Sequence, residues 1–169
     1  MSFIPYGRQD ISQDDIDAVV EILRSDFLTQ GPTVKKFEKC LAEYCDAKYA
    51  VAVNSATSAL HIACLALDVG SNDIVWTSPI TFVASANSAL YCGANVDFVD
   101  IDYETNNISI SALKDKLEKA KNSNSLPSVL IPVHMGGTSC DMEPIFKLSK
   151  EYGFKIIEDA SHAIGGSYK

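Results

Sequence analysis

The sequence predicts an α/β domain built on a mostly parallel sheet that is covered by helices. Short apolar runs of strand length alternate with segments of helical periodicity along most of the chain. Within most runs, successive positions are apolar, which is typical of strands buried on both faces. Two helical patterns precede the first run. We therefore expect an N-terminal helical arm over residues 1–48 and the first part of a sheet domain over residues 49–169.

Two amphipathic helices are predicted in the arm. Ser12 precedes two acidic residues, and apolar residues then recur at helical spacing as far as Leu23, as in a capped helix. The segment FLTQGP at 27–32 interrupts this pattern, and a second helical pattern runs from Val34 to Tyr44.

The remaining elements follow from the same periodicities and from the polar and glycine-containing turns between them. The predicted strands are Tyr49–Asn54, Ile74–Thr77, Val96–Val99, Val129–Val133 and Lys155–Glu158. The predicted helices are Thr57–Leu67, Phe82–Tyr91, Ser111–Lys121 and Glu143–Tyr152. Because a helix or a long connection separates each strand from the next, we expect the strands to run parallel.

The composition excludes several classes of function. The net charge is −8 and the pI about 4.7, so no excess of Lys and Arg is available to bind a nucleic-acid backbone. No apolar stretch is long enough to cross a bilayer, and the N-terminus lacks the basic and apolar regions of a signal peptide. We therefore expect a cytoplasmic protein that binds neither membranes nor nucleic acid.

The cysteines and histidines indicate neither a disulfide framework nor a metal site. The cysteines are odd in number and form no C-x-x-C, and the three histidines lack the spacing of metal ligands. We expect the thiols to be small buried groups in a reducing compartment. The five are Cys40, Cys45, Cys64, Cys92 and Cys140.

Candidate functional residues follow four of the predicted strands. Ligands of open parallel sheets bind beyond the carboxyl ends of the strands, so these segments are expected to meet at one edge. They are residues 54–58, 78–82, 134–137 and 159–162. The third, His134-Met135-Gly136-Gly137, reads equally well as a flexible connection, and we assign it no role.

The segment Asn54–Ser58 offers a helix N-terminus with free N–H groups, small side chains and hydroxyls, which suits a phosphate. Ordinary capping by Ser or Thr explains it as well. In the second segment, Phe82 at the rim is positioned to stack on a flat ring, although such an aromatic is more often part of the core.

The segment Glu158-Asp159-Ala160-Ser161-His162 is the most specific of the four. A carboxylate at the end of a buried strand is costly unless it is paired, and the protonated nitrogen of a pyridine ring is one suitable partner. Two alternatives remain open here. Asp159 could cap the following segment, and His162 could be a hydrogen-bonded core residue.

Taken together, these segments resemble the nucleotide-sugar aminotransferases of the DegT/DnrJ/EryC1/StrS family, which have the aspartate-aminotransferase fold (type I of the pyridoxal-phosphate enzymes). The stretches that carry the resemblance are FLTQGPTVKKFE, VNSATSALHIA, TSPITFVASAN and IIEDASHAIGGSYK. NSATSAL, SHA and PYGRQ look most like the branch that serves pseudaminic acid and surface-glycan biosynthesis.

The resemblance implies a role for each matching position. Ala56 and Thr57 would bind the phosphate of pyridoxal 5′-phosphate, Phe82 would stack on its ring, Asp159 would hold the ring nitrogen, and His162 would lie beside the ring. Asp159 and His162 are thus the expected catalytic residues. The expected substrate-binding residues are Tyr6, Asp26, Phe27, Leu28, Thr29 and Ala56.

The implied reaction is amination of carbon 4 of a UDP-linked 4-keto-6-deoxy sugar, with L-glutamate as amino donor, by a homodimer. The family's Schiff-base lysine lies on a later strand, and Lys169 comes too early to be that residue. We therefore expect an N-terminal fragment that is inactive alone. A dehydratase of the same family, with histidine at the lysine position, and a non-catalytic anion-binding module remain as alternatives.

Overall fold

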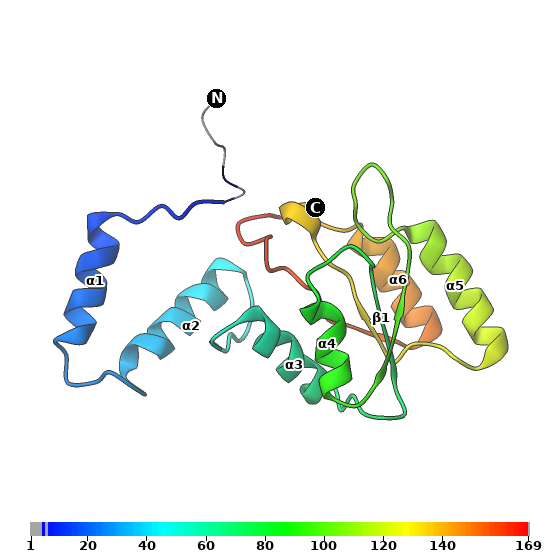
Figure 1. Ribbon diagram of the computed structural model, residues 1–169, viewed down its shortest axis with the longest axis horizontal. Coiled ribbons are helices and arrows are strands. Elements are labelled where there is room, and N and C mark those ends of the chain that lie inside the picture. Colours follow the sequence, from blue (N-terminus) through cyan, green and yellow to red (C-terminus); the bar gives the residue numbers. More distant parts are fainter. Residues whose placement is uncertain (1–4, 6, 169) are drawn as a thin grey trace. The chain divides into compact units, whose positions relative to one another are not determined.

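The computed structural model describes residue 5 and residues 7–168, and the chain divides into two compact units, Met1–Ala52 and Val53–Lys169. The first unit contains helices α1 (Gln13–Leu23) and α2 (Pro32–Tyr44) (Figure 1). Ser12 caps α1 as predicted, because its side chain accepts from Asp15 N–H while the Asp15 carboxylate accepts from Ser12 N–H. Neither helix has a buried residue.

The second unit is built around four parallel strands in the order β2-β1-β3-β4. The strands are β1 (Ile74–Thr77), β2 (Asn95–Phe98), β3 (Val129–Ile131) and β4 (Lys155–Ile156). The helices are α3 (Ala56–Ala66), α4 (Ala84–Tyr91), α5 (Ile110–Ser123) and α6 (Met142–Tyr152), with a short 3₁₀ helix, η1, at Met135–Gly137. The parallel α/β arrangement predicted from the sequence is confirmed.

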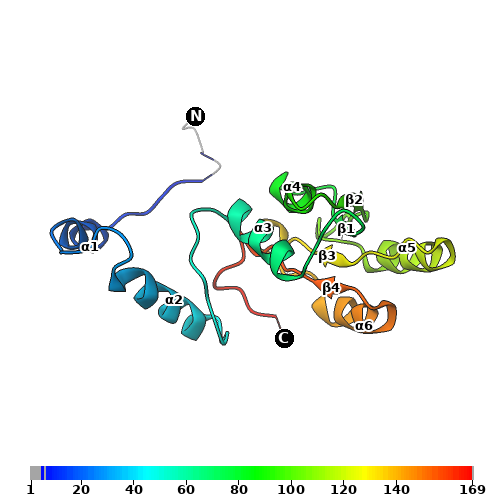
Figure 2. The ribbon, with the colours of Figure 1, turned by 90° about the horizontal axis from the view of Figure 1, so that it is seen from below.

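Helices cover both faces of this sheet, as Figure 2 shows. Alternation along the central strands divides their side chains between two cores. Val75 and Val129 pack with residues of α3 and α4, whereas Trp76 and Leu130 pack with residues of α5 and α6. The carboxyl ends of the strands are therefore held on a scaffold with a packed core on each side.

One predicted strand is wrong. Residues 49–54 form no ladder with any described strand, and the side chains of Tyr49 and Val51 are 76% and 75% exposed. An apolar run becomes a strand only where a neighbour completes its backbone hydrogen bonds, which the run itself does not reveal. Burial on both faces holds for β1 and β3, whereas β2 and β4 are largely exposed.

The expectation that the cysteines are buried is wrong for two of them. Cys40 and Cys45 are exposed, because they lie on and just after the second helix of a unit whose helices bury no residue. All five cysteines are free thiols. Among the described residues, no helix is long and apolar enough to span a bilayer, and no group of three or more His, Cys, Asp or Glu side chains has metal-binding geometry.

The core facing α5 provides a test of the fold. Leu117 on α5 is fully buried, so Leu117→Ala should lower the free energy of unfolding of the full-length protein by about 2–5 kcal/mol. Lys119→Ala, two residues along the same helix at an exposed position, should change it by less than about 0.5 kcal/mol. Urea denaturation measures both; equal effects would contradict this placement of α5.

Candidate active site

Asp159 lies just beyond β4, where the strand pairing continues for one more step. Its backbone N–H donates to Pro132 O at 2.9 Å, its own carbonyl accepts from His134 N–H at 3.1 Å, and it forms a parallel bridge with Val133. The residue is only 6% exposed. Its carboxylate is therefore fixed at the carboxyl end of the central strands, at the edge where a ligand was predicted.

Two serines hold this carboxylate. Ser161 donates to Oδ1 through its hydroxyl at 2.6 Å and its backbone N–H at 3.3 Å, while the buried Ser85 hydroxyl of α4 lies 2.7 Å from Oδ2. The bond from Ser161 N–H is the local contact that the capping alternative required. The bond from Ser85 crosses 74 positions of the sequence and joins the beginning of α4 to the loop after β4.

Ser85 belongs to a short chain of hydroxyls. Its oxygen lies 2.7 Å from Asp159, 3.2 Å from the Phe82 carbonyl and 2.7 Å from Thr81 Oγ1. Because a hydroxyl has one proton and the carboxylate is the stronger and closer acceptor, we assign that proton to the bond with Asp159. Thr81 must then donate to Ser85, so proton donation runs from Thr81 through Ser85 to Asp159.

The hydrogen bonds around Asp159 leave room for one more donor. An ionised carboxylate offers about four acceptor positions. Described residues fill two of them on Oδ1 and one on Oδ2, and no described cation pairs with Asp159. A buried carboxylate with an open position on Oδ2 is the environment that a protonated ring nitrogen needs.

Phe82 lies at the start of the segment that carries Ser85. The Ser85 N–H donates to the Phe82 carbonyl at 3.1 Å, so the two residues belong to one turn at the beginning of α4. The alternative that Phe82 belongs to the core is wrong, because its side chain is 75% exposed. The turn therefore places an exposed aromatic ring and the hydroxyl that contacts Asp159 at the same end of α4.

The N-terminus of α3 has free donors. Ser55 caps the helix by accepting from Ser58 N–H at 3.2 Å, which leaves the N–H groups of Ala56 and Thr57 without an acceptor among the described residues. Capping and anion binding are thus compatible here. The helix runs back from this end toward the turn that leads into β1 and packs beside α4 (Figure 1).

His162 is exposed rather than part of the core, so the core alternative is wrong. Its backbone is tightly enclosed: a Cβ added to Gly137 would meet the His162 carbonyl oxygen at 2.8 Å. The glycine-rich turn after β3 therefore contacts the loop that carries Asp159 and His162. No role was predicted for this turn from the sequence.

A buried histidine supports the start of that turn. His134 is 5% exposed, with Nε2 3.0 Å from the Glu158 carboxylate and Nδ1 accepting from Cys140 N–H at 3.1 Å. The side chain of Cys140 and the carboxylate of Glu158 raise the pKa of His134, and burial of the ring opposes them. In the neutral ring, Nδ1 accepts from Cys140 N–H, so the ring proton lies on Nε2, which donates to Glu158.

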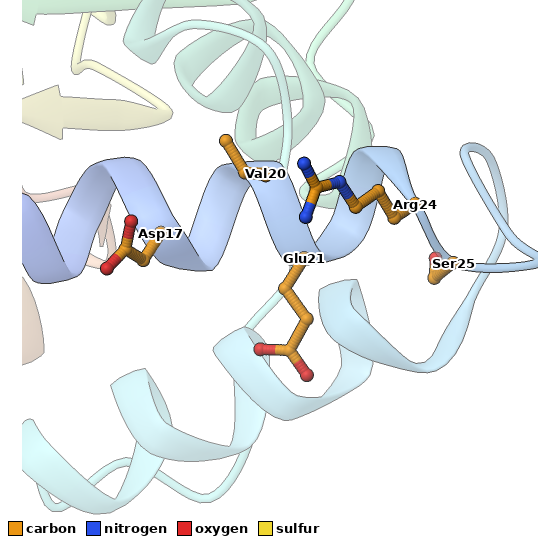
Figure 3. Close-up of a pocket in the computed structure, with 5 residues that line it drawn as sticks. All are labelled: Asp17, Val20, Glu21, Arg24 and Ser25. Carbon is orange, nitrogen blue, oxygen red and sulfur yellow. The ribbon is translucent and has the colours of Figure 1, made fainter.

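The predicted substrate residues Asp26, Phe27, Leu28 and Thr29 lie in the first unit, on the exposed segment after α1. Tyr6 and Lys169 lie outside the described residues. A hollow on α1 is lined by Glu21 and Arg24 among others, and their side chains point in different directions from the near side of the helix (Figure 3). It contains none of the predicted substrate residues, and its lining is Asp17, Val20, Glu21, Arg24 and Ser25.

Comparison with known proteins identifies the family of this chain. Residues 9–169 match the model of the DegT/DnrJ/EryC1/StrS aminotransferase family. The chain belongs to that family. Its recognition from the motifs is confirmed, and the match extends over both units.

Relatives of this aminotransferase family member include proteins that act on sugars. The UDP-4-amino-4,6-dideoxy-N-acetyl-β-L-altrosamine transaminase of Campylobacter jejuni is 45% identical over 98% of this chain and 43% of its own length. Helicobacter pylori PseC, an aminotransferase involved in the biosynthesis of pseudaminic acid, superposes with a TM-score of 0.88 at 34% identity, over 98% of this chain and 43% of PseC.

Spr1654 from Streptococcus pneumoniae has been solved in a PMP form that superposes with a TM-score of 0.88 at 31% identity, and in a PLP form. The alignment with the PMP form covers 99% of this chain and 44% of Spr1654. These likenesses confirm the prediction that this chain has the fold of the pyridoxal-phosphate aminotransferases. The chain spans less than half the length of the relatives that it matches.

Ser85→Ala tests the support of the carboxylate. Removing the donor to Oδ2 leaves a buried charged oxygen poorly satisfied, so the free energy of unfolding should fall by roughly 1–3 kcal/mol. Ser88→Ala is the matched control, because Ser88 is buried one turn later and donates only to the backbone carbonyl of Ser85. Thermal unfolding of the cofactor-free protein should show the larger loss for Ser85→Ala; the reverse order would refute the network.

Proposed function

We propose that the full-length protein containing this chain is a pyridoxal-phosphate-dependent transaminase that aminates carbon 4 of a UDP-linked 4-keto-6-deoxy sugar. Membership of the aminotransferase family and the likeness to two sugar-processing relatives support this reaction class. The single observation within the structure that carries the proposal is Asp159, a buried carboxylate with one open acceptor position and no described cation as partner.

Pyridoxal 5′-phosphate is the cofactor, and residues of the second unit hold it. The open N–H groups of Ala56 and Thr57 bind the phosphate, with the positive end of the α3 dipole adding to the attraction. Phe82 stacks on the ring, Asp159 accepts from the ring nitrogen, and His162 lies beside the ring. The exposure of Phe82 and His162 and the open N–H groups of Ala56 and Thr57 support these assignments.

Asp159 has the central chemical role. By accepting a hydrogen bond from the protonated ring nitrogen, it would keep that nitrogen charged, and the bound cofactor would then supply an electron sink for the carbon that gains or loses nitrogen. Ser85 and Ser161 hold the carboxylate in a fixed orientation, because both donate hydrogen bonds to it. The two serines thus orient the carboxylate and leave the open acceptor position on Oδ2 free.

The proposal also covers the sugar substrate, the amino donor and the oligomeric state. The proposed contacts of the nucleotide-sugar are Tyr6, Asp26–Thr29 and Ala56, and L-glutamate supplies the amino group. The active form is a homodimer, and the product feeds pseudaminic acid and surface-glycan synthesis. We place the reaction in the cytoplasm, since all five cysteines are free thiols, as expected in a reducing compartment.

Thr57→Val tests the phosphate site. Loss of the hydroxyl should weaken the affinity of the full-length apo-protein for pyridoxal 5′-phosphate about tenfold, because a hydrogen bond to a charged group contributes about 1.5–3 kcal/mol. Thr33→Val is the matched control: Thr33 is the second residue of α2, as Thr57 is of α3. Titration followed by absorbance measures the cofactor affinity of both variants. Equal affinities would show that the phosphate binds elsewhere.

Asp159→Asn tests the ring partner. The amide no longer stabilises a charged ring nitrogen, so kcat for sugar amination should fall at least about a hundredfold while cofactor affinity changes far less. Asp68→Asn, on the exposed turn after α3, should leave both unchanged. The assay supplies glutamate and a UDP-linked 4-keto sugar to the full-length protein.

The same assay separates the alternatives. Release of a sugar hydroxyl without transfer of nitrogen would replace the transaminase by a dehydratase. A full-length protein that takes up no pyridoxal 5′-phosphate would support the anion-binding module instead.

A further inference from the structure

We propose that the glycine-rich turn at Met135–Gly137 is a positioning element for the cofactor site, and that Gly137 sets the place of the loop carrying Asp159 and His162. The inference rests on the function proposed above. It assigns a role to residues 135–137, for which the sequence predicts none. These residues are not among those proposed to bind the phosphate or the ring nitrogen.

The contact between turn and loop is backbone against backbone. Gly137 has a φ of +89°, and a Cβ there would lie 2.8 Å from the carbonyl oxygen of His162, closer than such atoms approach. Gly166 also lies close to Gly137. A Cβ added to Gly166 would lie 3.0 Å from the Ala163 carbonyl oxygen and 3.6 Å from the Gly137 carbonyl oxygen. Any side chain at Gly137 must push the loop away.

The turn itself is held rigidly. Asn107, only 4% exposed, accepts from Met135 N–H and donates to the Thr138 carbonyl, both at 2.9 Å. Gly137 N–H donates to the His134 carbonyl at 3.1 Å, and the His134 ring is fixed between Cys140 and Glu158. A turn tied at both ends to buried side chains can hold a neighbouring loop in place.

Two local turns shape the outer part of the loop, because Ala163 N–H donates to the Ala160 carbonyl and Gly166 N–H to the Ala163 carbonyl, both at 2.9 Å. Asp159 is fixed by strand pairing, and Ser161 by its bonds to the Asp159 carboxylate. The His162 side chain is exposed and makes no hydrogen bond to any of the described residues. The position of its ring beside the cofactor therefore depends on the position of its backbone, and Gly137 lies directly against that backbone.

Gly137→Ala in the full-length protein is the test, with Gly153→Ala as control. Gly153, just after α6, has a similar φ of +81° but open space where a Cβ would be, so it matches the conformational strain without the collision. Gly136→Ala (φ +60°, open space) probes the same turn without the contact. Titration of each apo-protein with pyridoxal 5′-phosphate gives the affinity and the visible band of the bound cofactor.

We expect Gly137→Ala to weaken cofactor affinity at least about tenfold and to shift the band, at a melting temperature of the apo-protein equal to that of Gly153→Ala. Gly153→Ala should bind within about twofold of the parent, and Gly136→Ala, which strains the turn without the collision, should weaken binding less than Gly137→Ala does. Asn107→Ala, which frees the turn without adding bulk, should also weaken binding and guards against misfolding of Gly137→Ala.

Two results would overturn the role of the turn: equal affinity for Gly137→Ala and Gly153→Ala, or parental affinity for Asn107→Ala. A parent protein that binds no cofactor would overturn the proposed function and this inference together. That outcome is distinguishable, because it appears before any variant is made.

Discussion

The buried carboxylate of Asp159 is the constraint on which the arrangement of the site depends. A charge that is 6% exposed must be surrounded by donors, and here they come from α4 and from the loop after β4. Ser85 can reach Asp159 only if α4 begins beside the end of β4. The strand order β2-β1-β3-β4 places just one strand, β3, between β1, which leads into α4, and β4. Satisfying one charge therefore requires the parallel topology that the apolar runs predict.

The fold was largely predictable because burial produces periodicity. β1 was placed at Ile74–Thr77, as observed, and α1 and α6 to within a few residues, since each has a continuous apolar face or run. Tyr49–Asn54 was not predictable in the same way. Its apolar residues resemble a strand, but a strand depends on a neighbour, and those side chains are exposed in this chain.

The site was predictable only in part, for a related reason. Asp159 could be found because a charge at the end of an apolar run demands a partner wherever the run lies in space. Ser85 could not, because a serine in the small-residue helix ASANSALY has no distinctive pattern and its partner is 74 positions away. Gly137 was overlooked because a glycine after a strand indicates a turn, whereas its contact with the His162 carbonyl exists only in three dimensions.

The positions predicted to meet the cofactor and the sugar divide between the two units. Ala56, Thr57, Phe82, Asp159 and His162 all belong to the second unit, whose strands and helices share packed cores. Asp26–Thr29 belongs to the first, whose helices bury no residue. A rigid scaffold suits a cofactor that must be held at a fixed angle, whereas exposed segments can vary without disturbing a core. If the proposed function holds, substitutions near Asp159 should therefore change the chemistry itself, and those at 26–29 should change which sugar undergoes it.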